Sequence, residues 1–246
     1  GKKTSELETI GDSQDTGTQI TFLPDKAIFD AINFQYDILS NRLRELAFLN
    51  AGIKIQIIDL RNNKEETFQY EGGIKSFVQF LNKNKNPIFP DVIYLRKEKE
   101  KIDAEIAMQY NDGYQETIFS FVNNINTIEG GTHLEGFKAA LTRAINNYII
   151  KKKFNGKNNS TGLTGEDVRE GITAIISIKI LEPQFEGQTK AKLGNSEVKG
   201  LVDSMVYENF TNFLEENPPI ASLIVKKTLN AAQAREAARK ARELTR

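Results

Sequence analysis

The sequence predicts a mixed α/β protein, and three observations lead to this prediction. Segments in which apolar and polar residues alternate, as in half-buried strands, are interleaved with segments that carry an apolar stripe at helical spacing. Residues 172–181 are apolar on both faces, which is typical of a central strand in a sheet. The composition is 39% hydrophobic and 27% charged over 246 residues, so the chain can bury a sizeable core.

The composition also excludes several classes of protein. The chain has no cysteine, which excludes disulfides and thiolate metal sites and fits a cytosolic setting. Its formal net charge is zero, so binding of nucleic acid would need a local basic patch. No apolar run approaches the roughly 20 residues of a membrane-spanning helix. The polar first residues lack the apolar core of a signal peptide.

The first elements predict an α/β piece that is not a complete domain. Residues 18–22 alternate as a short strand, and residues 33–50 carry a helical stripe. Residues 52–59 and 67–70 then alternate on either side of a turn, as in a hairpin. The apolar positions are Ile20 and Phe22 in the strand, Phe34, Ile38, Leu39, Leu43, Leu46 and Leu49 in the helix, and Ile53, Ile55, Ile57, Phe68 and Tyr70 in the hairpin.

A short helix and three strands are predicted next. The helix follows Gly72 and Gly73, and its apolar positions are Ile74, Phe77, Val78 and Leu81. Strand patterns occupy residues 91–97, 101–110 and 115–122. The residues Asn-Asp-Gly at 111–113 tolerate positive φ and are a strong hairpin signal. We therefore expect the second and third of these strands to pair with each other.

A long helix is predicted after Gly130 and Gly131, with the apolar face Leu134, Phe137, Leu141, Ile145, Tyr148 and Ile149. Thr132 and Glu135 have the spacing of a capping box, which places His133, the single histidine of the chain, in the first turn. A Ser-His-Asp site would have to use His133, but a packing role is the simpler interpretation. The basic stretch 151–162 that follows is expected to be a flexible surface loop.

The predicted central strand leads into a loop that could carry chemistry. Thr164 and Asp167 have cap-like spacing before the strand, and Gly187, Gln188 and Lys190 follow it. Lysine is a point cation suited to a terminal phosphate, and glutamine can hold a phosphate oxygen or an attacking water. The alternative is that both are solvated residues of a turn, since the chain has no Walker-type glycine loop.

Two helices are predicted at the end of the chain, separated by two prolines at 218 and 219. The last helix begins near Ile220 and ends in a stretch rich in alanine and arginine. Residues 221–246 hold seven Lys or Arg against two Glu, a net charge of +5. A helix with such a weak apolar face is typical of a connector between domains or of a segment that contacts a polyanion.

The order of several motifs adds a resemblance to these patterns. The motifs are "TGTQITFLPD", "LRELAFLNAGIKIQIID", "YEGGIKSFVQFLN", "EGGTHLEGFKAALTRAINNY", "DVREGITAIISIKILEPQFEGQTKAKLGNSEV" and "AREAARKARELTR". Together they closely resemble the B subunits of bacterial DNA gyrase over essentially the whole chain. The B subunits of topoisomerase IV are similar but fit "LRELAFLN" and the arginine-rich end less well.

This resemblance implies a domain organisation. Residues 1–73 look like the C-terminal part of an ATP-binding domain of the GHKL superfamily. Residues 74–231 look like a transducer domain, an α/β sandwich with a left-handed βαβ crossover, against the usual right-handed rule. Residues 232–246 look like a connector helix toward the DNA-cleavage region.

The resemblance also implies site residues and cofactors. Lys190 and Gln188 match the loop that contacts and positions the γ-phosphate of ATP, and Thr18 matches a residue that binds the adenine through a side-chain and water network. The general base and the Mg²⁺ ligands of the family lie outside this chain, so we expect no metal site here and no activity from this segment alone.

The implied function is that of an ATP-dependent type II DNA topoisomerase that couples ATP hydrolysis to strand passage and negative supercoiling. The implied partners are double-stranded DNA, a gyrase A subunit in an A2B2 complex, and a second B subunit upon ATP binding, with no membrane. Lys138 and Arg143 could contact DNA or be a solvated helix face. The implied location is the bacterial cytoplasm, associated with the nucleoid.

Two other hypotheses remain open from the sequence. The chain could be an autonomous module whose last two helices dock a protein partner, with the loop at 187–190 as an ordinary turn. It could instead bind DNA through the basic last helix, using Arg235, Arg239 and Arg242 in a salt-dependent manner.

Overall fold

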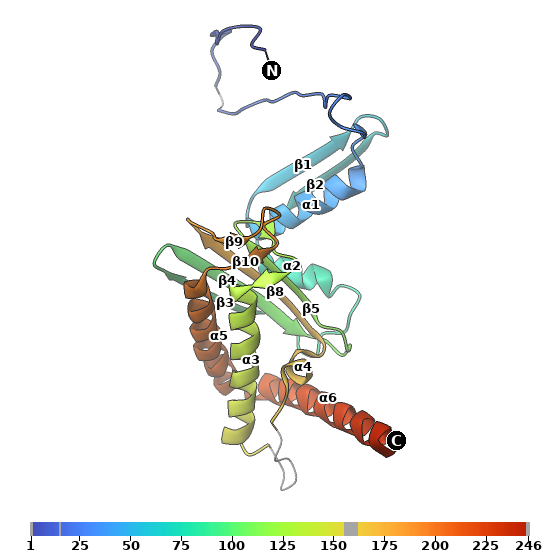
Figure 1. Cartoon of the computed structure of the whole chain (residues 1–246), viewed down its shortest axis with the longest axis vertical. Helices are drawn as coiled ribbons and strands as arrows, with labels where there is room; N and C mark the ends of the chain where they lie inside the picture. Colours follow the sequence, from blue (N-terminus) through green and yellow to red (C-terminus); the bar gives the residue numbers. More distant parts are fainter. Residues whose placement is uncertain (1, 15, 155–161, 245–246) are drawn as a thin grey trace. The chain divides into compact units, whose positions relative to one another are not determined.

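The computed structural model describes residues 2–14, 16–154 and 162–244. The chain divides into two units, Gly1–Leu39 and Ser40–Arg246, and Figure 1 labels the helices and strands. The predicted basic loop at 151–162 lies partly outside the described residues, because residues 155–161 are not described.

The predicted strand at residues 18–22 is wrong. No described residue of the first unit belongs to a strand, and Ile20 and Phe22 expose 78% and 71% of their surfaces. An alternating pattern becomes a strand only when another strand takes up its backbone N–H and C=O groups. No segment in the described part of the chain pairs with residues 18–22.

Helix α1 (Tyr36–Leu49) begins in the first unit and continues into the second. Its last turns bury Ala47, Phe48 and Leu49, whereas Ile38 and Leu39 are exposed. The predicted apolar stripe is therefore correct at its C-terminal end and wrong at its N-terminal end. In the second unit α1 contacts the hairpin of β1 (Lys54–Asp59) and β2 (Lys64–Gln69), where Ser40 Oγ donates a hydrogen bond to Glu66.

A five-stranded sheet forms the centre of the second unit, in the order β3-β4-β8-β5-β6. The strands are β3 (Ile93–Lys99), β4 (Ile102–Tyr110), β5 (Thr117–Val122), β6 (Ile125–Asn126) and β8 (Ile172–Ile180). As predicted, β8 is central: it pairs antiparallel with β4 and parallel with β5, and its first seven residues are buried.

The predicted hairpin at Asn111-Asp112-Gly113 is also wrong, because β8 lies between β4 and β5. Asn111 Oδ1 accepts a hydrogen bond of 2.9 Å from the Gly113 amide, so a local turn does form. After this turn the chain enters β5, which is separated from β4 by β8, instead of forming a strand that pairs with β4. The two-residue hairpin loops occur elsewhere, at Glu100-Lys101 and Asn123-Asn124, where all four residues have positive φ.

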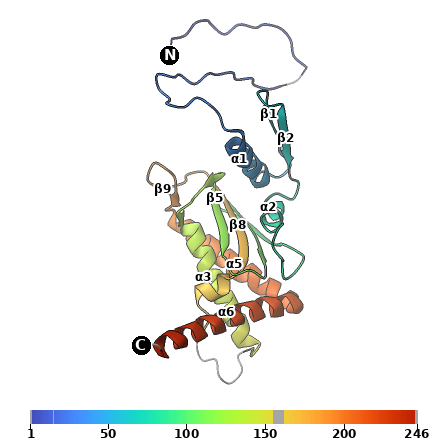
Figure 2. The same cartoon turned by 90° about the vertical axis from the view of Figure 1, so that its right-hand side faces the viewer.

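Helices cover both faces of the sheet, as the predicted sandwich requires (Figure 2). Helix α2 (Ile74–Leu81) forms one layer with the end of α1, and there Phe77 stacks on Phe48 at 4.8 Å between ring centroids. The other face is covered by α3 (Thr132–Lys151) and α5 (Ser196–Glu216). Alternate residues of β8 serve the two layers, with Ile175 in the α2 cluster and Ile176 in the α3 cluster.

The connection from β5 to β8 runs through α3 and the short helix α4 (Gly165–Arg169). It is therefore a helical crossover between parallel strands, and the left hand of this crossover stays a prediction. Thr164 and Asp167 form a capping box at α4. The capping box predicted at Thr132 is absent: α3 has no side-chain cap, and Thr132 Oγ1 is buried without a partner among the described residues. His133 lies in the first turn of α3, as predicted.

The last helix, α6 (Pro218–Leu244), starts two residues before the predicted start, with Pro218 at its first position. It follows α5 after the single residue Asn217, so the two prolines begin a helix as well as ending one. None of the helices in the described residues is long and apolar enough to cross a membrane.

Candidate functional site

The loop that carries Gln188 and Lys190 is a short hairpin at one end of the second unit. It connects β9 (Phe185–Glu186) to β10 (Lys192–Leu193), which pair antiparallel. Gly187 and Lys190 both have positive φ, at 81° and 55°. Glycine adopts this conformation at little cost, whereas for Lys190 the surrounding hairpin has to hold it. The turn therefore projects residues 187–190 outward, and all four are exposed.

Asn195 fixes the base of this loop. Its Oδ1 accepts a hydrogen bond of 2.7 Å from the Gln184 amide, and its Nδ2 donates to the Glu182 carbonyl and to Glu197. Asn195 is 2% exposed, and the Gly194 amide adds a bond of 2.7 Å to the Gln184 carbonyl. One buried side chain thus joins both arms of the loop to the start of α5.

A second contact joins the loop to α3. Strand β10 pairs in parallel with β7 (Gly130–Gly131), the dipeptide directly before α3. The Glu129 amide also donates to the Ala191 carbonyl at 3.0 Å. A Cβ atom on Gly131 would overlap the backbone of Leu193, so glycine is required for this close approach. The far arm of the loop is therefore fixed to the N-terminus of α3.

The side chains at the loop tip are free to bind a ligand. Within the described residues, neither Gln188 nor Lys190 makes a side-chain hydrogen bond or ion pair, whereas nearby Lys192 is paired with Glu186 at 3.1 Å. A rigid base with an unpaired cation and an amide at its tip is suited to a phosphate presented from outside the unit. Residues 187–190 include no carboxylate or imidazole that could act as a general base, so the loop can position a phosphate but does not activate water alone.

Thr18 lies in the first unit and is exposed in a segment without regular secondary structure. It therefore belongs to a different unit from Gln188 and Lys190, and its predicted contact with adenine stays a prediction.

Among the described residues no group of three or more His, Cys, Asp or Glu side chains could hold a metal ion. The Mg²⁺ ligands that the resemblance places elsewhere also stay a prediction.

Lys138 and Arg143, the predicted DNA contacts, are both engaged in ion pairs. Lys138 Nζ lies 2.7 Å from Glu116 Oε1, and Glu116 also pairs with Arg169 at 2.8 Å. Burial opposes ionisation of Glu116, but hydrogen bonds from these two cations lower the pKa of its carboxyl group. Arg143 pairs with Asp203 at 2.8 Å and lies over the ring of Tyr207. These contacts favour a structural role, and a contact with DNA stays a prediction.

His133 is fully buried, and its Nε2 lies 3.0 Å from Thr127 Oγ1. Burial lowers the pKa of His133 to about 4, so its imidazole is neutral near pH 7. The partner of Nε2 is a buried threonine within the core rather than a group in a cleft. The packing interpretation of His133 agrees with this environment.

The most informative residues outside the predicted set are Asn195 and Gly131, which hold the loop in place. The sequence places Asn195 next to Gly194 at a helix start, which is an ordinary position for a cap. The role of Gly131 depends on a strand 62 residues later in the chain, the difference between positions 193 and 131, so no local pattern could reveal it.

The fold defines a class of structure, that of the ATPase domains of gyrase B and of topoisomerase IV. Two solved structures of this class share the fold. The 43K ATPase domain of Thermus thermophilus gyrase B, solved with an aminocoumarin, matches with a TM-score of 0.78 and 41% identity over 90% of this chain and 59% of that chain. The ATP-binding domain of Francisella tularensis topoisomerase IV, solved with a small-molecule inhibitor, matches with a TM-score of 0.72 and 29% identity over 86% of this chain and 57% of that chain.

Sequence comparison identifies the family. The family model described as DNA gyrase B matches residues 73–244, and the chain belongs to this family. Two relatives are the B subunits of DNA gyrase from Clostridium acetobutylicum, 58% identical, and from Halalkalibacterium halodurans, 54% identical. Both matches cover 100% of this chain but only 39% of the relative. The chain thus spans well under half the length of these relatives.

Proposed function

We propose that this chain is the nucleotide-sensing and coupling part of an ATP-dependent type II DNA topoisomerase, a DNA gyrase that introduces negative supercoils. The observation that carries the proposal is the rigidly held loop whose tip presents the unpaired side chains of Gln188 and Lys190. Membership of the DNA gyrase B family supports it. A topoisomerase IV B subunit is the alternative, and the 58% identity to a gyrase B favours gyrase.

In this proposal the loop detects whether a γ-phosphate is present. The bound nucleotide, with its Mg²⁺, supplies the phosphoanhydride and its negative charge. Lys190 holds the terminal phosphate as a point cation, and Gln188 orients a phosphate oxygen and the attacking water. Thr18 helps to hold the adenine. The general base and the metal ligands lie in parts of the protein outside this chain.

The loop would pass this information on because its base is rigid. Asn195 and the β7–β10 pair fix the loop to α5 and α3, so a phosphate held at the tip restrains the whole second unit. Loss of the γ-phosphate removes that restraint and shifts the equilibrium between orientations of the domains. In this proposal residues 1–73 close the ATP-binding domain, 74–231 form the transducer, and 232–246 connect to the cleavage region.

The wider assembly belongs to the same proposal. The partners are double-stranded DNA, a gyrase A subunit in an A2B2 complex, and a second B subunit in an ATP-dependent dimer. The location is the cytoplasm, at the nucleoid. A DNA-binding module built on the basic last helix is less well supported, because Arg235 pairs with Asp167 and Arg239 pairs with Glu236 and Glu243. These cations are already partly neutralised within the chain.

The test replaces Lys190 by alanine in the full-length protein and measures ATP binding and steady-state hydrolysis separately. Loss of a charge-assisted contact in the transition state should lower the hydrolysis rate by about a hundredfold while nucleotide binding largely survives. Lys199→Ala is the matched control, because Lys199 is an exposed lysine on α5 that pairs with Glu135. Unchanged hydrolysis in Lys190→Ala would show that the loop is only a turn.

A further inference from the structure

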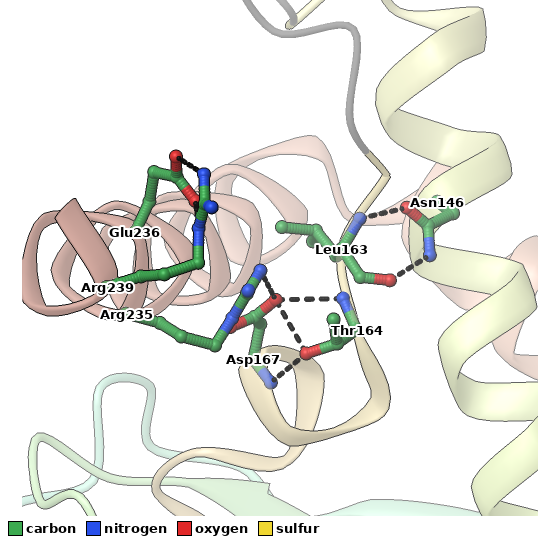
Figure 3. Close-up of polar contacts among 7 residues, drawn as sticks. All are labelled: Asn146, Leu163, Thr164, Asp167, Arg235, Glu236 and Arg239. Carbon is green, nitrogen blue, oxygen red and sulfur yellow. Dashed lines mark hydrogen bonds and ion pairs between the residues drawn. The ribbon is translucent and has the colours of Figure 1, made fainter. Parts of the chain in front are cut away.

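Helix α6 packs against the rest of the second unit through the buried side chains of Ile224 and Val225, and Lys227 and Arg235 add polar contacts. Lys227 Nζ donates to the carbonyls of Asp112 and Gly113, at 3.2 and 2.7 Å, and lies 3.2 Å from Glu170 Oε1. Eight residues further along the helix, Arg235 pairs with Asp167 through both Nε and Nη2, at 2.8 and 3.0 Å. Figure 3 shows the Arg235 guanidinium directed at this carboxylate. We name the Asp167–Arg235 pair the clasp.

Asp167 serves two elements through one carboxylate. Its Oδ2 accepts hydrogen bonds from the Thr164 amide and the Thr164 hydroxyl, both at 2.8 Å, which caps α4. The same carboxylate receives Arg235 of α6. Burial alone would raise the pKa of Asp167, but the bonds from Arg235 and Thr164 hold it below its ordinary value. The side chain of Asp167 is only 2% exposed, so without Arg235 a buried charge would lose its one cationic partner among the described residues.

The clasp is tied to α3 through the residue before the cap. Asn146 Nδ2 donates to the Leu163 carbonyl at 3.0 Å, and the Leu163 amide donates to Asn146 Oδ1 at 2.9 Å, as Figure 3 shows. Leu163 is followed directly by Thr164. The hydrogen bonds therefore run from α3 through Leu163, Thr164 and Asp167 to Arg235.

The other end of α3 is tied to the loop at 187–190. Gly131, directly before α3, pairs with Leu193 of β10. The 20 residues of α3 span about 30 Å at 1.5 Å per residue. In Figure 1 the helix runs from the small strands β9 and β10 at one end to α4 and α6 at the other. A single helix thus contacts the loop at its start and the clasp near its end.

Beyond the clasp, the ion pairs of Arg239 and Lys240 lie within α6 itself. Arg239 pairs with Glu236 and Glu243, and Lys240 lies 3.8 Å from Glu236. Such pairs three and four residues apart stiffen a helix without attaching it to anything else. The direction of this exposed last part is therefore set where α6 is held, at Arg235 and upstream.

We propose that Asp167 and Arg235 are positioning residues that fix the direction in which α6 leaves the second unit, and that the clasp is where a change at the loop reaches α6 through α3. This inference rests on the proposed function. Coupling between two sites needs an element whose arrangement both sites bias. Here α3 is that element, and a change in the position of α3 reaches α6 only while the Asp167–Arg235 contact is intact.

The first experiment measures coupling in the full-length protein assembled with its partner subunit. ATP turnover and supercoils introduced are recorded for wild type, Arg235→Ala, Asp167→Asn and the double variant. We expect turnover within about twofold of wild type and a fall of about tenfold in supercoils per ATP, the size of an ordinary coupling free energy. The double variant should be no worse than Arg235→Ala, because both changes break one contact.

Two further variants separate geometry from charge. Arg239→Ala removes a cation one turn further along the same helix and should leave supercoils per ATP unchanged. Arg235→Lys keeps the charge but loses the two-point contact and should restore only part of the coupling. Equal losses in Arg235→Ala and Arg239→Ala would mean that the charge of the helix matters and would overturn the clasp. Full coupling in Arg235→Ala would overturn it as well.

A distance measurement tests the clasp independently of catalysis. Spin labels on the exposed residues Ala139 of α3 and Ala238 of α6, in the full-length protein, should give a narrow distance distribution that broadens in Arg235→Ala but not in Arg239→Ala. An unchanged distribution in Arg235→Ala would refute the positioning role. If Lys190→Ala leaves hydrolysis intact but Arg235→Ala still broadens the distance distribution, the proposed sensor fails and the clasp remains. If Lys190→Ala abolishes hydrolysis but Arg235→Ala leaves the distribution unchanged, the sensor remains and only the clasp is refuted.

Discussion

His133 has no exposed surface, and burial has moved the pKa of its imidazole to about 4. The cause is physical and local: a charged imidazolium would lose its hydration in the core, and its hydrogen-bond partner, Thr127, carries no charge. Two lysines differ in their contacts. Lys190 is exposed at a loop tip and remains available for a ligand, whereas Lys227 is already held by carbonyls and Glu170.

The buried state of His133 predicts a pH dependence of stability. The unfolded chain takes up a proton near pH 6.5 and the folded chain only near pH 4, so stability is complete above pH 6.5 and is lost as the pH falls toward 4. The total loss from this residue is about 3 kcal/mol. Because the chain has one histidine, the imidazole signal in a proton NMR titration reports on it directly.

For the folded chain we expect no change of that signal from about pH 8 to about pH 5. The denatured chain is the control and should titrate near the ordinary value. A midpoint near 6.5 in the folded chain would contradict the buried, neutral state.

Among the elements, the contact between β7 and β10 is short but decides where the loop lies. It consists of two residues on each strand, and Gly131 with φ of 129° allows the backbones to approach. The side chain of any other residue would overlap Leu193. The contact between β7 and β10 therefore tolerates no residue other than glycine at position 131.

Gly131→Ala is expected to separate β10 from α3. Overlap and strain at this position should cost at least about 2 kcal/mol of folding free energy. The amide of Glu129, which donates to Ala191, should exchange its hydrogen faster, as measured by hydrogen exchange. The control is Gly200→Ala on α5, where a Cβ meets open space and helix propensity predicts a small gain. Normal protection of Glu129 in Gly131→Ala would contradict this account.

The elements also show what sequence patterns can predict. The helices at 74–81 and 132–151, the capping box at Thr164 and the central position of β8 follow from local periodicity and cap chemistry. These signals are local, and they were confirmed. The resemblance to the DNA gyrase B family was confirmed as well.

Pairings between distant segments could not be predicted in this way. The hairpin at Asn111-Asp112-Gly113 failed because the partner of both β4 and β5 comes much later in the chain. The strand at 18–22 failed because alternation does not supply a partner strand. Within the site, Gln188 and Lys190 were found as a loop motif, but Asn195, Gly131 and the clasp act through contacts that sequence spacing does not show.

In the second unit as a whole, two apolar layers share one sheet. The layer under α2 includes Phe77, Phe121 and Ile175, and the layer under α3 and α5 includes Phe137, Ile176 and Phe210. Since the residues of β8 alternate between them, neither layer can lose its packing without disturbing the strand that both use. The unit should therefore unfold in one cooperative step.

Phe77→Ala tests this expectation. Phe77 is 6% exposed and stacks on Phe48, so truncation should lower the free energy of unfolding by about 3–5 kcal/mol. Urea unfolding is followed by far-UV circular dichroism and by tyrosine fluorescence, and the two curves should shift together. Phe80→Ala on the same helix is the control: Phe80 is 44% exposed and should lose roughly 1 kcal/mol. Two separate transitions would contradict the shared sheet.

The position of β8 late in the sequence also has a consequence for the chain while it is being synthesised. Both β4 and β5 need β8 as a neighbour, and the last residue of β5 and the first of β8 are 50 positions apart, at 122 and 172. At roughly 5–20 residues per second, β5 is complete about 2.5–10 s before β8 begins to be synthesised, and β4 is complete earlier still. During that interval their inner edges carry unpaired N–H and C=O groups and apolar side chains, the combination that leads to aggregation. A nascent chain that stalls before residue 172 would expose both edges, which makes this part of synthesis the stage at which a chaperone would be most needed.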